Sequence, residues 1–206
     1  MHRKEIITTG KKIEEAKKAL ILAHGRGASA EDILNLAPFL KVKDYVLIAP
    51  QATNYTWYPH SFLAPPQQNE PWLSSALDLL AELVHDINAA GIPDDQIYFL
   101  GFSQGACLTL EYLARHAKKW GGAAAFTGGL IGDKVYSENY KGDFNGTPIF
   151  IGTSNPDPHV PVERVHETVT TLIKLNASVT EKIYQNMGHT ISEDEIEKAN
   201  QLIFDK

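Results

Sequence analysis

Six short apolar runs rich in β-forming residues alternate with longer helical patterns along the 206 residues of the chain. Several of these runs are continuously apolar, as expected for strands buried on both faces of a sheet. The six expected strands are residues 19–23, 45–49, 96–100, 122–126, 148–153 and 178–184. A further edge strand is expected at residues 6–8, and the mixed polar character of 178–184 also places that strand near an edge. The alternation predicts an α/β fold with a mostly parallel, doubly wound sheet of six or seven strands flanked by helices.

Three helical patterns between these runs have recognisable ends. A stripe of leucine, valine and isoleucine spans residues 73–87, with Ser74 or Ser75 as the expected N-cap and Gly91 beyond its end. A second stripe spans residues 162–173. A third helix is expected to begin at Ser192, where Glu195 completes a capping box. A chain of this length has room for one core, so we expect a single domain over residues 1–206 with a minimal lid.

Composition and charge exclude several classes of function. The net charge of −6 gives no electrostatic support for binding nucleic acid or an anionic membrane. Cys107 is the single cysteine, so an internal disulfide and a cysteine-rich zinc site are both excluded. The N-terminal residues lack the apolar core of a signal peptide, and no apolar run approaches the roughly 20 residues of a membrane span. We therefore expect a cytoplasmic protein without a membrane span or a nucleic-acid partner.

A serine flanked by two glycines follows the run 96–100. Gly101 and Gly105 permit a sharp turn from strand to helix, and such a turn would lift the Ser103 hydroxyl clear of the sheet. The helix N-terminus that follows favours developing negative charge, and the Gln104 backbone N–H would face it. A helix-capping serine in an ordinary loop is the alternative. The strand before and the helix after Ser103 favour the nucleophile.

A candidate acid and a candidate base follow two later strands. Asp157 lies between two prolines after 148–153, and such a rigid loop suits a residue that must orient a histidine. His189 lies in the loop between the last strand and the last helix. Asp133 and Asp143 are rivals for the acid in loops away from strand ends, and His159 is the main rival for the base. The resulting order of serine, acid and histidine is that of α/β-hydrolases.

A glycine-rich turn, His24-Gly25-Arg26-Gly27-Ala28-Ser29, follows the run 19–23. Such a turn presents backbone N–H groups, which an acyl-transfer site needs for the oxyanion. His24 is expected to buttress this backbone, and Ser29 to cap the next helix. An ordinary turn without a catalytic role is the alternative.

These stretches together resemble the phospholipase/carboxylesterase family of α/β-hydrolases, which includes acyl-protein thioesterases and small bacterial esterases. The matching stretches are "LILAHGRGAS", "LIAPQA", "LGFSQGA" and "DPHVP", with "GH" at Gly188-His189. The form "HGRGAS" departs from the "HGLGD" of the eukaryotic thioesterases and is similar to a bacterial branch of predicted esterases.

The resemblance implies a catalytic triad of Ser103, Asp157 and His189, with an oxyanion hole formed by the backbone N–H groups of Arg26 and Gln104. It implies hydrolysis of a small-molecule carboxylic ester, thioester or lysophospholipid through an acyl-enzyme, without a metal or cofactor. Family members often form dimers, so a homodimer is one assembly that the resemblance allows.

Substrate contacts are expected mainly from the long aromatic segment 51–72. The candidates are Trp57, His60 and Phe62 from this segment and His159 from the loop after 148–153. The alternative for the aromatic residues is that they pack the segment onto the body of the protein. Two rival functions stay open: a catalytically silent binding protein with the same fold, and a lactone hydrolase similar to dienelactone hydrolase, which uses cysteine where this chain has Ser103.

Overall fold

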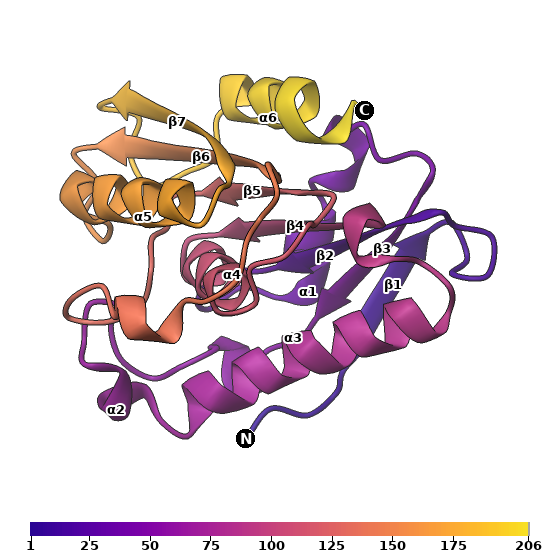
Figure 1. Cartoon of the computed structure of the whole chain (residues 1–206), viewed down its shortest axis with the longest axis horizontal. Helices are drawn as coiled ribbons and strands as arrows, with labels where there is room; N and C mark the ends of the chain where they lie inside the picture. Colours follow the sequence, from indigo (N-terminus) through magenta and orange to yellow (C-terminus); the bar gives the residue numbers. More distant parts are fainter. Residues whose placement is uncertain (206) are drawn as a thin grey trace.

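The computed structural model describes residues 1–205 and contains a seven-stranded sheet with the order β1-β3-β2-β4-β5-β6-β7 (Figure 1). Strands β2 to β7 run parallel, and β1 pairs antiparallel with β3 at one edge. The strands are β1 Ile6–Gly10, β2 Lys18–Ala23, β3 Tyr45–Pro50, β4 Ile97–Phe102, β5 Gly122–Phe126, β6 Pro148–Asn155 and β7 Ser178–Gln185. The α/β-hydrolase sheet expected from the sequence is confirmed, including both edge strands.

Helices cover both faces of the sheet. The helices are α1 Ala30–Leu34, α2 Pro66–Asn69, α3 Trp72–Ala89, α4 Gln104–Arg115, α5 Val162–Lys174 and α6 Glu193–Ala199. Short 3-10 turns lie at Ala37–Phe39, Thr53–Tyr55, Asp94–Gln96 and Ser137–Asn139, and a π-helical turn at Asn200–Phe204 follows α6. Among residues 1–205, no helix is both long and apolar enough to cross a membrane.

The core lies in two layers because successive residues of each strand point to opposite faces. Ile21 and Phe99 belong to the cluster that packs against α3, α4 and α5. Leu20 and Leu100 belong to the second cluster, which packs against α1 and the C-terminal turn at Asn200–Phe204. The central strands are thus buried on both faces, which explains why they read as continuous apolar runs.

The helix ends follow the sequence prediction with one correction. Ser29 and Ser192 cap α1 and α6 in capping boxes with Asp32 and Glu195. Helix α3, in contrast, begins at Trp72, before the serines expected to cap it. The Glu70 carboxylate accepts hydrogen bonds from the Ser74 N–H (3.1 Å) and hydroxyl (2.8 Å), so an acidic side chain upstream satisfies a first-turn donor instead.

Candidate active site

Ser103 occupies a sharp turn between β4 and α4. Its backbone angles are φ 54° and ψ −118°, a conformation that is costly for a residue with a side chain. Two hydrogen bonds hold it: the Ser103 N–H donates to the Phe126 carbonyl of β5 (2.9 Å), and the Cys107 N–H donates to the Ser103 carbonyl (3.0 Å). The turn therefore projects the hydroxyl beyond the carboxyl end of the sheet.

Gly105 lets the first turn of α4 pack directly on the end of β2. A Cβ built at Gly105 would lie 2.1 Å from the Ala23 carbonyl oxygen and 2.6 Å from that of His24. No side chain fits in that space without moving a backbone. The close approach brings the glycine-rich turn after β2 beside Ser103, since a Cβ built at Gly25 would lie 3.6 Å from Ser103 Cβ.

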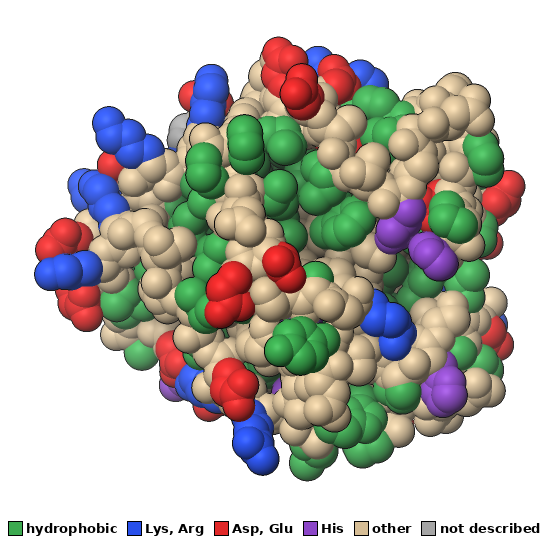
Figure 2. Space-filling view, turned by 180° about the vertical axis from the view of Figure 1, so that it is seen from behind, with side chains coloured by type: hydrophobic (Ala, Val, Ile, Leu, Met, Phe, Trp, Pro, Cys, Tyr) green, Lys and Arg blue, Asp and Glu red, His purple; other side chains and the backbone are tan. Residues whose placement is uncertain are grey.

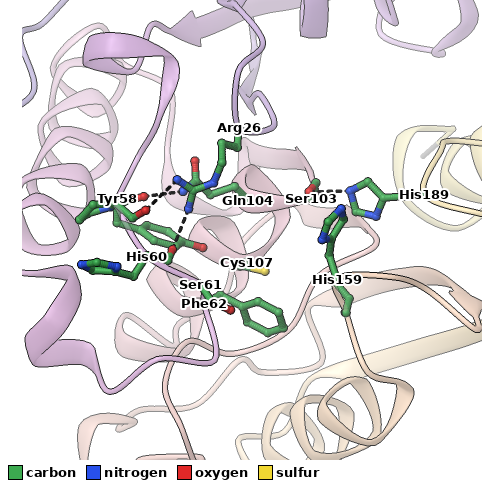
Figure 3. Close-up of a pocket in the computed structure, with 12 residues that line it drawn as sticks. Arg26, Tyr58, His60, Ser61, Phe62, Ser103, Gln104, Cys107, His159 and His189 are labelled. Carbon is green, nitrogen blue, oxygen red and sulfur yellow. Dashed lines mark hydrogen bonds between the residues drawn. The ribbon is translucent and has the colours of Figure 1, made fainter.

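The structure brings Ser103, His189 and Asp157 into one hydrogen-bonded chain. His189 Nε2 lies 2.8 Å from Ser103 Oγ (Figure 3). On the other side of the ring, His189 Nδ1 lies 2.9 Å from Asp157 Oδ2. Because an ionised carboxylate can only accept, Nδ1 carries the imidazole proton and Nε2 is left to accept from the serine hydroxyl. The imidazole also packs against Phe102 and edge-on against His159, with ring centroids 5.3 and 4.9 Å away.

Both oxygens of the Asp157 carboxylate have partners. Oδ1 accepts the backbone N–H groups of His159 (2.8 Å) and Val160 (2.9 Å), while Oδ2 accepts from His189. Burial of the side chain by itself raises the pKa of Asp157, but these hydrogen bonds outweigh it and leave the pKa below its ordinary value. The carboxylate is thus charged and held in one orientation. The rivals Asp133 and Asp143 lie elsewhere, bonded to Tyr136 and to Asn145 and Asn176.

Ser154 links the loops that carry Asp157 and His189, and sequence reasoning missed it. Its buried hydroxyl donates to the Pro156 carbonyl (3.0 Å) and accepts from the Gly188 N–H (3.0 Å). Pro156 directly precedes Asp157, and Gly188 directly precedes His189. The one Ser154 hydroxyl therefore sets the spacing of the two loops. Its position at the end of the run 148–153 was the available signal, but a serine there reads as an ordinary loop residue.

His24 supports the glycine-rich turn from inside the protein. Its buried ring has Nδ1 2.8 Å from the Gly25 carbonyl, and its Nε2 accepts the Ala52 N–H (3.1 Å). Burial lowers the pKa of His24, so the ring is neutral with its proton on Nδ1. Within residues 1–205, neither the Arg26 N–H nor the Gln104 N–H has a hydrogen-bonding acceptor, so both are free to face an oxyanion.

The side chains of Arg26 and Gln104 both hold the segment 56–60. Gln104 Oε1 accepts the Trp57 N–H (2.9 Å), and Gln104 Nε2 donates to the Tyr58 carbonyl (2.8 Å). The Arg26 guanidinium donates to Thr56 Oγ1 (2.9 Å) and to the carbonyls of Pro59 (3.0 Å) and His60 (2.7 Å). The segment that walls the site is therefore fixed by the side chains of the same two residues whose backbone N–H groups have no acceptor within residues 1–205.

A cleft of about 560 Å³ opens over Ser103. Figure 3 shows Ser103 and His189 on one side of this cleft and the Tyr58–Phe62 segment on the other. Its lining residues are Arg26, Tyr58, Pro59, His60, Ser61, Phe62, Ser103, Gln104, Cys107, His159, Val160 and His189. Three of the four expected substrate contacts, His60, Phe62 and His159, thus line it.

Trp57 is the exception, and here the expectation is corrected. The side chain is fully buried in the core and is not among the residues that line the cleft. Its indole N–H donates to the His24 carbonyl (2.8 Å), and its ring lies 4.9 Å from the His24 ring. Burying a large aromatic side chain with its one polar group satisfied stabilises the segment, so Trp57 anchors it rather than meeting a substrate.

Cys107 lies at the floor of the cleft, one helical turn after Ser103. Burial raises the pKa of its thiol to about 12, so the reactive thiolate is not available near neutral pH. Among residues 1–205, no group of three or more histidine, cysteine or acidic side chains is arranged to hold a metal ion.

Known proteins resemble this chain along nearly its whole length. The family model described as Phospholipase/Carboxylesterase matches residues 4–204. The crystal structure of a phospholipase/carboxylesterase from Dyadobacter fermentans is 57% identical, superposes with a TM-score of 0.96, and aligns over 97% of this chain and 96% of its own.

More distant relatives include acyl-protein thioesterase 1 of Eremothecium gossypii, which is 28% identical over 90% of this chain and 86% of its own length. A probable SOBER1-like carboxylesterase of Arabidopsis thaliana is 28% identical over 63% of this chain. The matched part spans only 50% of that plant protein.

Proposed function

The chain belongs to the phospholipase/carboxylesterase family, and we propose that it is a serine hydrolase that cleaves small or medium-chain carboxylic esters. In this proposal Ser103 is the nucleophile, His189 the general base and Asp157 the residue that orients the base. Thioesters and lysophospholipids are the further substrate classes to compare with simple esters.

The first half of the reaction would form an acyl-enzyme. Ser103 Oγ attacks the ester carbonyl while His189 Nε2 takes the hydroxyl proton, and His189 then donates that proton to the leaving alcohol. In the second half, His189 Nε2 takes a proton from a water molecule as the water oxygen attacks the acyl-enzyme carbonyl. The bond between the acyl group and Ser103 Oγ then breaks, the carboxylic acid leaves, and His189 returns the proton to Ser103 Oγ. Asp157 stabilises the imidazolium in both halves.

The negative charge on the carbonyl oxygen would be held by the backbone N–H groups of Arg26 and Gln104. Neither donor has another acceptor among the residues that the structure describes, and the second lies at the positive end of α4. Loss of one such donor typically costs about 100- to 1000-fold in turnover in serine hydrolases. Backbone donors survive side-chain substitution, so the side chains of both residues can be varied separately from this role.

The observation that carries the proposal is the unbroken chain of hydrogen bonds from Asp157 through His189 to Ser103, with distances of 2.9 and 2.8 Å. A catalytically silent binding protein has no need of this chain together with a strained serine turn. The lactone-hydrolase alternative is not favoured, because serine rather than cysteine occupies the turn and the one cysteine has a strongly raised pKa.

Hydrolysis of p-nitrophenyl esters of increasing acyl length, beside an acyl-thioester and a lysophospholipid, tests the proposal. Turnover is expected on short and medium chains, and Ser103→Ala and His189→Ala are each expected to abolish it. Ser178→Ala, at an exposed position on β7, is the matched control and should keep wild-type rates. Wild-type turnover in Ser103→Ala, or activity confined to emulsified long-chain triglycerides, would contradict the proposal.

A further inference from the structure

Arg26 carries a positive charge into the cleft without a negative partner. Its guanidinium donates three hydrogen bonds, and all three acceptors are neutral oxygens, those of Thr56, Pro59 and His60. No carboxylate lies within ion-pair distance of Arg26 among residues 1–205. A guanidinium has five N–H donors, so two remain for a ligand.

The lining of the cleft does not offset this charge. Among the described residues it holds three histidines, His60, His159 and His189, and no aspartate or glutamate. Figure 2 shows histidine side chains and a Lys or Arg side chain around a hollow at one end of the molecule.

Two carboxylates that lie behind this lining, Asp157 and Glu111, are already paired. Asp157 is bonded to His189 and two backbone N–H groups. Glu111, beneath the floor, is buried against Arg115 at 2.7 Å and also accepts from the Ile131 N–H and the Tyr140 hydroxyl. Neither offsets the Arg26 charge at the mouth.

A positively charged cleft on a chain with net charge −6 favours negatively charged ligands over neutral or positively charged ones. Walls of low dielectric focus the field of a charge that lies in a cleft, and this raises the local concentration of anions. The planar guanidinium also matches the geometry of a carboxylate, with charge-assisted hydrogen bonds stronger than those between neutral groups. The three bonds to the segment 56–60 fix the guanidinium in advance, so little order is lost when an anion binds.

On the basis of the proposed function, we propose that the cleft binds a carboxylate carried by the ester substrate, with Arg26 as the specificity-determining residue. The carboxylate belongs to the acyl group or to the alcohol of an ester small enough for the cleft. His60 and His159 are neighbours of this subsite, and the Arg26 side chain is its main donor.

Three esters of similar size show whether the carboxylate belongs to the acyl group or to the alcohol of the substrate. Ethyl butyrate is the neutral reference, monoethyl succinate carries the carboxylate on the acyl side, and O-butyryl glycolate carries it on the alcohol side. Each kcat/KM, measured by pH-stat, is divided by the rate constant for alkaline hydrolysis of the same ester. We expect one of the two anionic esters to exceed ethyl butyrate about tenfold, the size of one charge-assisted hydrogen bond. We also expect this preference to shrink in high salt.

Variants of Arg26 separate its charge from its role in holding the segment. Arg26→Gln should remove the preference, and Arg26→Lys should retain part of it, because the charge is kept and the fork of donors is lost. The ratio of anionic to neutral ester within one variant is the readout, so a partial loss of folding cancels. Lys174→Gln, an exposed charge change at the end of α5, should leave the ratio unchanged.

The outcomes separate the two proposals. Hydrolysis of ethyl butyrate without preference for either anionic ester, or a preference that survives in Arg26→Gln, would overturn the carboxylate subsite and leave the esterase proposal standing. Failure to hydrolyse any of the three esters would count against the esterase proposal itself.

Discussion

Asp157 divides its two carboxylate oxygens between its own loop and His189. Oδ1 holds the loop through two backbone N–H groups, and Oδ2 holds His189. Since the pKa of Asp157 is lower in the folded chain than in the unfolded one, the ionised carboxylate stabilises the fold above its unfolded pKa of about 3.9. That contribution is lost as the pH falls through the lower pKa of the folded state.

Asp157→Asn is expected to lower kcat by about 10³- to 10⁴-fold with a small change in KM. The amide keeps an oxygen for the backbone N–H groups but turns a donor toward His189 Nδ1. The imidazole then carries its proton on Nε2 and cannot accept from Ser103. Steady-state kinetics on a p-nitrophenyl ester measure this, and retention of more than a tenth of the wild-type kcat would contradict the assignment of Asp157.

Ser154 is expected to act as a positioning residue. Ser154→Ala removes both bonds that join the loops of Asp157 and His189, so we expect kcat to fall about tenfold while KM stays within twofold. The melting temperature is measured alongside, because the Pro156 carbonyl and the Gly188 N–H also lose their partner. A fall in melting temperature with unchanged kcat would show that the bonds only stabilise the fold.

At the element scale, each site residue follows the carboxyl end of its own strand. Ser103 follows β4, Asp157 follows β6 and His189 follows β7. Parallel pairing continues to Asn155 opposite Gln185, and this brings the last two loops side by side. The N-terminus of α6 comes next, so its capping residues lie close behind the histidine loop.

Glu195 of the α6 capping box is expected to cost stability at neutral pH. Burial raises the pKa of its carboxyl, and Oε1 has no hydrogen-bonding partner within residues 1–205. A group whose folded pKa lies above its unfolded value contributes full stability below the unfolded pKa and loses it as the pH rises through the folded pKa. Thermal unfolding of Glu195→Gln should therefore show a higher free energy of unfolding than wild type at pH 7, and this difference should shrink toward pH 4. An equal difference in the free energy of unfolding at pH 7 and at pH 4 would contradict this prediction.

Local patterns explain how much of these elements the sequence could predict. All seven strands, the helix caps at Ser29 and Ser192, and the residues that meet at Ser103 follow from runs and turns a few residues long. Contacts between distant segments do not. Three features depend on how loops pack, which no local sequence pattern predicts. These are the burial of Trp57, the bridging of two loops by the Ser154 hydroxyl, and the hydrogen bonds from the Gln104 side chain to segment 56–60.

At the scale of the whole molecule, two apolar layers share one sheet. Residues of β2, β3 and β4 alternate between the two clusters. Because the same strands carry both layers, loss of packing in one layer also disturbs the other. The cleft lies across the carboxyl end of this sheet, with its histidines and Arg26 above the common core.

We propose that the chain forms a single domain. Thermal unfolding followed by far-ultraviolet circular dichroism and by tryptophan fluorescence should then give one coincident transition, because two of the reporters, Trp57 and Trp120, are buried in the same cluster. Two separate transitions would contradict a single cooperative unit.

The central claim is that Ser103 is an activated nucleophile. A fluorophosphonate probe reacts covalently with such a serine and leaves inactive serines unmodified. Intact-mass analysis of the folded protein should show one adduct, mapped by peptide sequencing to Ser103, and none in Ser103→Ala or in heat-denatured protein. No adduct on the folded wild-type chain, or an adduct that persists in Ser103→Ala, would contradict the account.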